Sequence, residues 1–394
     1  MSGSMPYKAA QTAAPATTSY IMSVAIMRGL VIVLMALDHV RGFFTDADFS
    51  ATDLSRTHLM LFLTRWVTHL CAPAFVFLAG TSAFLSAQGE DRRQLAIRLL
   101  TRGLWLVILE LTVVRFSWYF NLDYNQMSLQ VIWALGWSMV VLSALIYLPL
   151  WAIASVGILM ISAHNLLDGI RLDDFRAVDG TLGWQGWALS VLHIPHYPVI
   201  YPLIPWIGVM AAGYAFGPVM LAASETRRKA ALACGIVLIT AFVILRAYNV
   251  YGDPVPWSGQ ETGLFTLLSF LNTTKYPPSL LYLLMTLGPM FVLLAAFEQA
   301  QGSIGRFLMI FGRVPLFFYL VHLYVIHALA VAVAFAMSGD IQLSSSETFS
   351  SWWGFGLPVV YLTWIAVVIL LYPVCQWFAG LKSRHRGSWW TPYI

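Results

Sequence analysis

The stretch MRGLVIVLMALDHVRGFF, Met27 to Phe44, sets the class of this protein, because it combines a long apolar run with several ionisable side chains. With the residues before it, the run extends from Ile21 to Phe44, enough helix to cross a bilayer core, which takes roughly 20 residues. The whole chain has this character: of its 394 residues, 59% are hydrophobic and 10% are charged. Soluble domains are about 25% charged. The composition excludes an ordinary soluble enzyme and indicates an all-α, polytopic membrane protein.

Apolar windows of membrane-spanning length recur along the chain, separated by charged or Pro/Gly-rich breaks. No internal repeat is visible among them. Two further apolar stretches, 183–195 and 263–271, are too short to span and are expected at the interface or as re-entrant pieces. We predict about ten spans, at Ile21–Phe44, Leu59–Ala87, Leu95–Trp118, Met127–Leu148, Pro149–Ala163, Val199–Ala223, Ala230–Val250, Ser279–Phe297, Pro315–Met337 and Phe355–Phe378.

The Lys and Arg residues orient these helices. With both termini on one side, that side receives the basic loops and the other side receives the acidic ones. Because basic loops stay in the cytoplasm, both termini are predicted to be cytoplasmic. Residues 1–20 are expected to be a disordered cytoplasmic tail, 21–380 a single helical domain and 381–394 a basic, aromatic cytoplasmic tail. The net charge of +4 fits this topology, and no nucleic-acid partner is expected.

Ionisable side chains inside a membrane helix are costly and are therefore candidates for function. The first helix carries Asp38, His39 and Arg41, and the second carries Arg65 and His69, four residues apart on one face. Histidine accepts a proton near neutral pH, so His39 or His69 is a candidate general base with Asp38 as its orienting carboxylate. A purely structural account, in which Asp38 pairs with the arginines and the histidines are packing residues, stays open.

Three further residues extend this list. His322 lies on the ninth span with Tyr319 one turn before it, and Lys275 and Tyr276 precede two prolines that could form one lip of an external cavity. The usual nucleotide-binding and metalloprotease motifs do not occur, and the three cysteines lie far apart, so no metal is expected. What remains is acid/base chemistry by histidine in a membrane cavity, which suits acyl transfer and also proton-coupled transport.

Five blocks of the chain resemble bacterial members of the heparan-alpha-glucosaminide N-acetyltransferase catalytic-domain family, a group of transmembrane acyltransferases. The blocks are MRGLVIVLMALDHVRGFF (27–44), TRWVTHLCAPAFVFLAGTSAF (64–84), YPLIPWIGVMAAGYAFG (201–217), KYPPSLLYLLMTLGP (275–289) and FGRVPLFFYLVHLYVIH (311–327). One position departs from the family pattern. The family has an Asp three residues before the Arg-Gly of the first helix, whereas this chain has Ala25, so any partner of Arg28 must come from elsewhere.

The resemblance implies that the protein lies in the bacterial inner membrane, that acetyl-CoA is the co-substrate, entering from the cytoplasm, and that a sugar or glycan on the other side is the acceptor. His58 lies near the place of the proposed catalytic histidine of the eukaryotic namesake and is a candidate substrate contact. Arg41 and Arg65 would hold the carbonyl oxygen or an anionic acceptor group. Candidates for the CoA phosphates on the cytoplasmic face are Arg92, Arg93, Arg306 and Arg313.

Two other functions stay open at this stage. A transporter or flippase could use the same His, Asp and Arg side chains to relay protons, and a non-catalytic scaffold could keep the fold. Membrane lipid is the expected surrounding, and faces rich in Gly and Ala would permit a homodimer.

Overall fold

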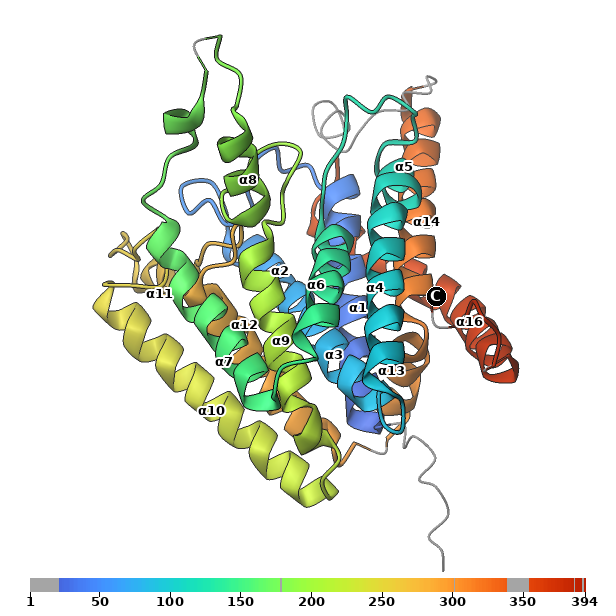
Figure 1. Cartoon of the computed structure of the whole chain (residues 1–394). Coiled ribbons are helices and arrows are strands. Elements are labelled where there is room, and N and C mark those ends of the chain that lie inside the picture. Colours follow the sequence, from blue (N-terminus) through green and yellow to red (C-terminus); the bar gives the residue numbers. More distant parts are fainter. Residues whose placement is uncertain (1–20, 178, 301, 339–353, 386, 392) are drawn as a thin grey trace, which may run out of the picture.

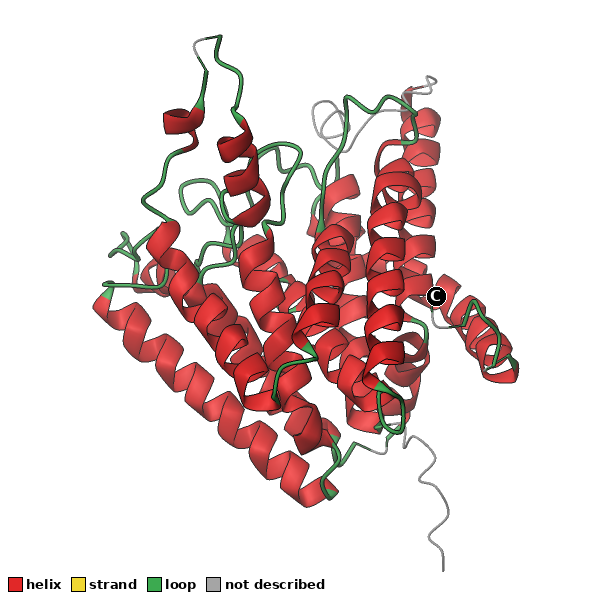
Figure 2. Ribbon diagram, in the orientation of Figure 1, coloured by secondary structure: helices red, strands yellow, loops and turns green. Residues whose placement is uncertain are grey.

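The protein is a bundle of helices in a computed structural model that describes residues 21–394 except 178, 301, 339–353, 386 and 392 (Figures 1 and 2). The predicted tail 1–20 therefore lies outside the described residues. Within the described ranges no strand is formed beyond isolated bridges. The α-helices are α1 (Met22–Phe44), α2 (Leu59–Thr68), α3 (Cys71–Ser86), α4 (Arg92–Leu109), α5 (Arg115–Tyr119), α6 (Val131–Leu145), α7 (Leu150–Ala163), α8 (Trp184–Leu192), α9 (Leu203–Met220), α10 (Ser224–Tyr248), α11 (Gly263–Leu271), α12 (Leu280–Phe297), α13 (Ser303–Arg313), α14 (Pro315–Ser338) and α16 (Leu357–Arg384).

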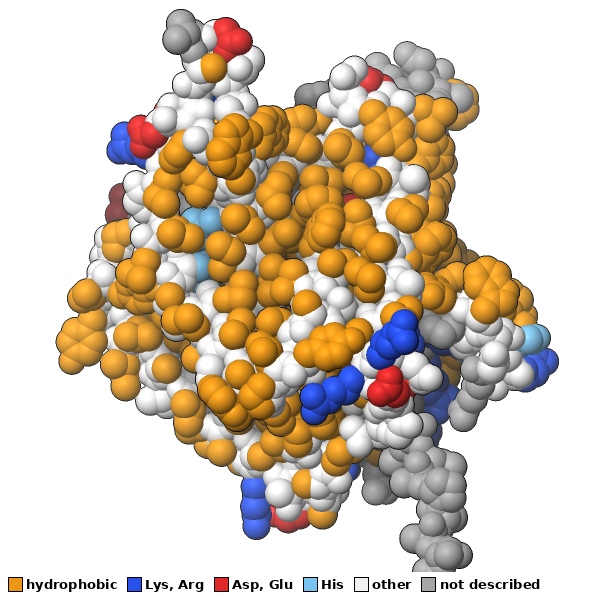
Figure 3. Space-filling model, viewed as in Figure 1, with side chains coloured by type: hydrophobic (Ala, Val, Ile, Leu, Met, Phe, Trp, Pro, Cys, Tyr) orange, Lys and Arg blue, Asp and Glu red, His pale blue; other side chains and the backbone are white. Residues whose placement is uncertain are grey.

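The all-α membrane fold predicted from the sequence is confirmed. Among the described residues, 8 spans are long and apolar enough to cross a membrane, with α2 and α3 forming one of them. The two remaining predicted windows are also helical. One is α6, of 15 residues, and the other is α4 continued through a π-helical turn, Glu110–Val114, into α5. Hydrophobic side chains cover most of the face in Figure 3, as expected for contact with lipid.

Helix α1 lies inside the bundle and packs against α3, α12, α13, α14 and α16. Its crossing with α13 depends on two glycines. A Cβ on Gly29 would lie 1.8 Å from the carbonyl oxygen of Leu308, and a Cβ on Gly312 would lie 1.8 Å from that of Ala25. Small residues let membrane helices approach this closely. The short helix α13 was not among the predicted segments, because it is too short to resemble a span.

Two consecutive parts of the chain share one succession of elements. In each, a first α-helix is followed by an α-helix of 9 residues and then by one of 18 residues: α7 (14 residues), α8 and α9 in the first part, and α10 (25 residues), α11 and α12 in the second. The short helices α8 and α11 occupy the two apolar stretches that were predicted not to span. The structure thus contains a repeated unit that is not visible in the sequence.

The turns and crossings of the two units also correspond. The turn before α9 contains Tyr197-Pro198 and the turn before α12 contains Tyr276-Pro277, each with a cis peptide bond and an antiparallel bridge. In each unit the first and the last helix cross at glycines, Gly157 with Gly208 and Gly235 with Gly288. The second of these turns brings Lys275 and Tyr276 to the polar cluster described next.

Candidate functional site

Two histidines from helices far apart in the sequence meet near the end of α1 that carries Phe44. His39 Nδ1, on α1, lies 2.8 Å from Nε2 of His322, on α14. Nδ1 of His322 in turn lies 2.8 Å from the carbonyl oxygen of Phe318. His322 is fully buried, whereas His39 is partly accessible.

The hydrogen bonds of this pair fix which nitrogens carry protons. A carbonyl oxygen only accepts, so His322 Nδ1 donates to Phe318. In the neutral pair, His322 Nε2 then has a lone pair and His39 Nδ1 donates to it. His39 Nε2 is left with a lone pair and makes no hydrogen bond to a described residue. An oriented, partly accessible imidazole nitrogen with a lone pair is what a general base requires.

Asp38, the neighbour of His39, lies between two arginines. Its Oδ1 accepts a hydrogen bond of 3.0 Å from Arg41 on the next turn of α1, and its Oδ2 accepts one from Arg65 on α2. The three side chains are 15–18% exposed, so they are largely but not wholly withdrawn from solvent. Asp38 thus binds α1 to α2 and does not contact the ring of His39 through a hydrogen bond among the described residues. The role predicted for it, orienting a histidine directly, is untested.

The loop before α12 closes the other side of this cluster. Lys275 has its Nζ 5.2 Å from the centre of the Tyr276 ring, and Tyr276 packs at 5.3 Å against Tyr201 in the turn before α9. Burial alone would raise the pKa of the Tyr276 phenol, but the positive charges of Lys275 and Arg65 outweigh it and lower that pKa below its usual value. The two predicted substrate contacts therefore lie with Asp38, Arg41 and Arg65 at one site.

The other two predicted histidines lie apart from this pair. His69 follows α2 and is buried against Tyr282, at 5.3 Å between ring centres, and its Nδ1 has no hydrogen-bond partner in the described part of the chain. His58, just before α2, is exposed. His39 is thus hydrogen-bonded to His322, and no hydrogen bond to His69 is present among the described residues.

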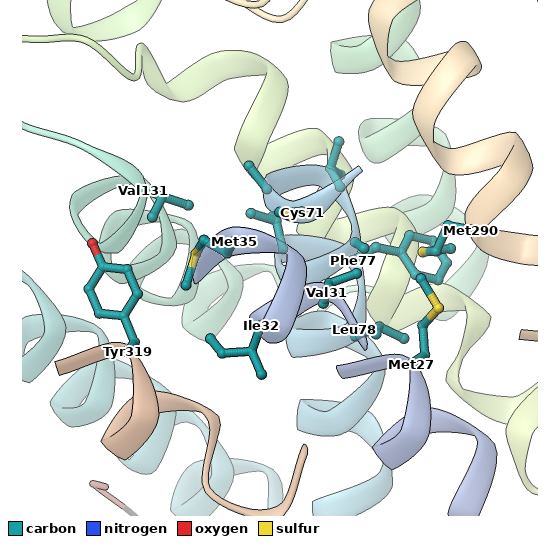
Figure 4. Packing of buried hydrophobic residues seen from close by; sticks show 14 of the residues in the cluster. Met27, Val31, Ile32, Met35, Cys71, Phe77, Leu78, Val131, Met290 and Tyr319 are labelled. Atoms are coloured by element: carbon teal, nitrogen blue, oxygen red, sulfur yellow. The ribbon is translucent and has the colours of Figure 1, made fainter. Parts of the chain in front are cut away.

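A cavity of about 150 Å³ extends along α1 between α3, α4, α6 and the start of α14. Arg28, Ile32 and Met35 line it from α1, and His39 is the next residue on the same helical face, since these positions follow one another by three or four. Eleven residues separate Arg28 from His39, which is about 16 Å of helix. Figure 4 shows Ile32 and Met35 on the side of α1 toward Val131 and Tyr319, while Met27 and Val31 point toward Phe77 and Met290.

The two ends of the cavity differ in chemistry. Its charged lining residues are Arg28 and Arg102, whereas Tyr319, at the other end, has its ring centre 6.1 Å from that of His39. The middle is apolar apart from Ser82. The four arginines expected to bind CoA phosphates lie elsewhere: Arg92, Arg93, Arg306 and Arg313 are exposed and do not line the cavity.

The sequence contained signals for the residues that were missed. Arg102 is an arginine well inside a predicted span, which is costly and therefore informative, and Tyr319 shares a helical face with His322. What the sequence could not supply is the pairing of α1 with α14. No group of three or more His, Cys, Asp or Glu that could hold a metal ion occurs in the described ranges.

The chain matches a known protein family. The model described as heparan-alpha-glucosaminide N-acetyltransferase, catalytic, matches residues 21–251, more than half of the chain. The matched range contains Arg28, Asp38, His39, Arg65 and Arg102. It ends before the loop with Lys275 and before His322. No curated protein matches the chain.

Proposed function

The chain belongs to the heparan-alpha-glucosaminide N-acetyltransferase catalytic family, and on this premise we propose that it transfers an acetyl group from cytoplasmic acetyl-CoA to an extracytoplasmic sugar or glycan. The family and the helical fold support a transmembrane acetyltransferase. The donor, the acceptor and the inner-membrane location are our proposal. The observation that carries it is the free Nε2 lone pair of His39 beside a cavity with arginines at its far end.

The chemistry assigned to His39 is that of a general base. Its Nε2 accepts a proton from the amine or hydroxyl of the acceptor as that atom attacks the thioester carbonyl. A new C–N or C–O bond forms, the C–S bond breaks, and the proton on Nε2 passes to the thiolate to give CoA–SH. His322 accepts the Nδ1 hydrogen of His39 throughout, so it holds the ring orientation and stabilises the imidazolium. The Tyr319 hydroxyl is our candidate donor to the carbonyl oxygen.

The cavity fits a slender donor arm. A void of about 150 Å³ holds a group the size of benzene, so a thioester arm could enter while the nucleotide stays at the mouth. Arg28 and Arg102 would bind phosphate there, since guanidinium groups pair well with phosphate oxygens. We therefore assign the phosphate contacts to this pair in place of the four exposed arginines.

One observation favours a second candidate, a proton-coupled transporter. The units α7–α9 and α10–α12 repeat a succession of elements, and structural repeats are common among transporters. The same histidine pair would then relay protons beside a substrate path. The two functions differ in one product, because only an acetyltransferase releases CoA.

The test is CoA release and product formation by the protein purified in detergent, with acetyl-CoA and a panel of amino sugars. We expect His39→Ala to lower kcat by about 10²- to 10⁴-fold, the usual contribution of a general base. His322→Ala should lower kcat with little change in either KM. His322→Gln should recover part of this loss, because its side-chain oxygen can accept the Nδ1 hydrogen of His39.

His385→Ala is the matched control, because His385 is exposed beyond the end of α16, and its rates should equal those of the wild type. Folded protein that releases no CoA with any acceptor, yet takes up sugar into vesicles when a proton gradient is applied, would overturn the acetyltransferase and favour the transporter. Full activity in His39→Ala would show that His39 is not the general base.

A further inference from the structure

The cluster beside His39 contains more positive than negative charge. Arg41, Arg65 and Lys275 all act electrostatically on His39, and the acid that acts on it is Asp38. The same three cations act on Asp38 itself. Three cations and one carboxylate thus act on His39, so positive charge predominates around this residue.

The carboxylate of Asp38 neutralises part of this positive charge. Each of its oxygens accepts a hydrogen bond from one arginine, so Arg65 and one amino group of Arg41 already have a partner. Nε of Arg41 is buried and has no hydrogen-bond partner in the described part of the chain. A buried guanidinium N–H without an acceptor is costly, so this N–H is available to an acceptor from outside the chain.

Lys275 has no such partner either. Its ammonium group forms no ion pair with a carboxylate of the described residues and lies over the face of the Tyr276 ring. It is half-buried in the loop before α12, and from there it acts on His69 as well as on His39. A lysine held toward a buried cluster without a counterion is placed to bind an anion.

We propose that the acceptor is an anionic sugar, whose carboxylate or phosphate is bound by Lys275 together with the free N–H of Arg41 while its amine or hydroxyl faces His39 Nε2. This inference rests on the proposed acetyl transfer and names the substrate class of the same site. The charged group gives the acceptor its orientation, because two cations from different elements, α1 and the loop before α12, fix the position of the anion.

The kinetic test compares amino sugars that differ in charge. Glucosamine is the probe without an anionic group. Glucosamine 6-phosphate carries a phosphate and muramic acid carries a carboxylate. We expect the wild type to prefer at least one anionic probe by 10-fold or more in kcat/KM, mainly through KM. Lys275→Gln should lose about 10- to 100-fold of that preference, as expected for one charge-assisted contact. Lys275→Arg should restore most of the preference.

Lys229→Gln is the control, since Lys229 is 72% exposed and pairs with Glu225 at 3.5 Å. It should show the wild-type preference. Equal kcat/KM for glucosamine and both anionic probes in the wild type, with transfer intact, would overturn the anionic acceptor and leave the acetyltransferase standing.

A binding measurement separates the two proposals. Without acetyl-CoA, calorimetry or thermal shift should show saturable binding of an anionic probe that Lys275→Gln weakens and Lys229→Gln does not. If the anionic probe binds in this way but no acceptor causes release of CoA, the anion site is supported and the proposed acetyl transfer is overturned. Absence of binding by both anionic probes to folded wild-type protein, with glucosamine still acetylated, would again overturn the anion site.

Discussion

At the scale of single residues, two neighbouring residues of the site make different contacts. Asp38 and His39 are neighbours on α1, yet their side chains have different partners. Asp38 binds two arginines and joins α1 to α2, whereas His39 binds His322 of α14. The acid therefore joins two helices of the cluster, and in the mechanism that we propose the second histidine would take the orienting role that carboxylates have in many catalytic pairs.

The loop residue Tyr276 gives a pH dependence that tests the charge of the acceptor site. Lys275 and Arg65 lower the pKa of its phenol from the ordinary value of 10.0, while burial and Asp38 oppose them. The phenol is neutral below its pKa and becomes a phenolate above it. As the pH rises through that pKa, the new negative charge offsets Lys275, so KM for an anionic acceptor should rise in the wild type.

The alkaline rise in KM should be absent in Tyr276→Phe, which cannot ionise there. Tyr248→Phe should behave as the wild type, because Tyr248 is 74% exposed at the end of α10. Steady-state kinetics with glucosamine 6-phosphate and with glucosamine, measured from neutral pH to about pH 10, check this. An equal alkaline rise in KM for the two sugars would contradict the assignment.

The sequence predicted individual residues of the cluster better than their partners. Asp38, His39 and Arg65 were found because ionisable groups in apolar helices are conspicuous. The contact of His39 with His322 spans 283 positions of the chain, and nothing in one sequence specifies that separation. Arg102 was not among the predicted site residues, although its side chain lines the cavity. Periodicity gives the face of a helix but not the neighbour that this face meets.

At the scale of elements, glycine crossings set the positions of the helices that carry the site. α1 approaches α13 at Gly29 and Gly312, and α3 approaches α9 at Gly80 and Gly213. At these crossings the backbones are so close that a Cβ would overlap a carbonyl oxygen. The windows of predicted helix were correct because apolar length is a strong signal. The short amphipathic helix α13 and the repeated unit were not predicted, because neither one changes the mean hydropathy along the chain in a recognisable way.

Gly29→Ala tests the crossing that positions the cavity. Its Cβ would lie 1.8 Å from the carbonyl oxygen of Leu308, so α1 and α13 must separate. Overpacking of this kind costs about 1–3 kcal/mol, and we expect a lower Tm in detergent. Gly42→Ala is a control on the same helix, because a Cβ there meets nothing within 4 Å. Since alanine favours helix, its Tm should be unchanged or higher. Equal Tm values for the two variants would contradict the close packing of α1 on α13.

At the scale of the whole molecule, the proposed reaction needs the two ends of one cavity to face opposite compartments. Arg28 and Arg102 lie at one end and the anion site lies beyond the other, with His39 between them. Most Lys and Arg side chains visible in Figure 3 lie in the lower half of the view. This half contains the N-terminal ends of α1 and α4, on the side of the cavity where Arg28 and Arg102 lie. The positive-inside rule predicts that this half faces the cytoplasm, so in the proposed reaction donor and acceptor would reach His39 from different sides.

This orientation can be tested with single cysteines in a variant whose native Cys71, Cys234 and Cys375 are replaced by Ala. Lys229→Cys places an exposed thiol near the start of α10, and Glu261→Cys places one in the loop before α11. A membrane-impermeant maleimide should label Glu261→Cys in intact cells and Lys229→Cys only after permeabilisation. Because α10 is one span of 25 residues, the two thiols must lie on opposite sides. Labelling of Lys229→Cys alone in intact cells would reverse the orientation, place Arg28 and Arg102 outside the cell, and remove cytoplasmic acetyl-CoA as the donor.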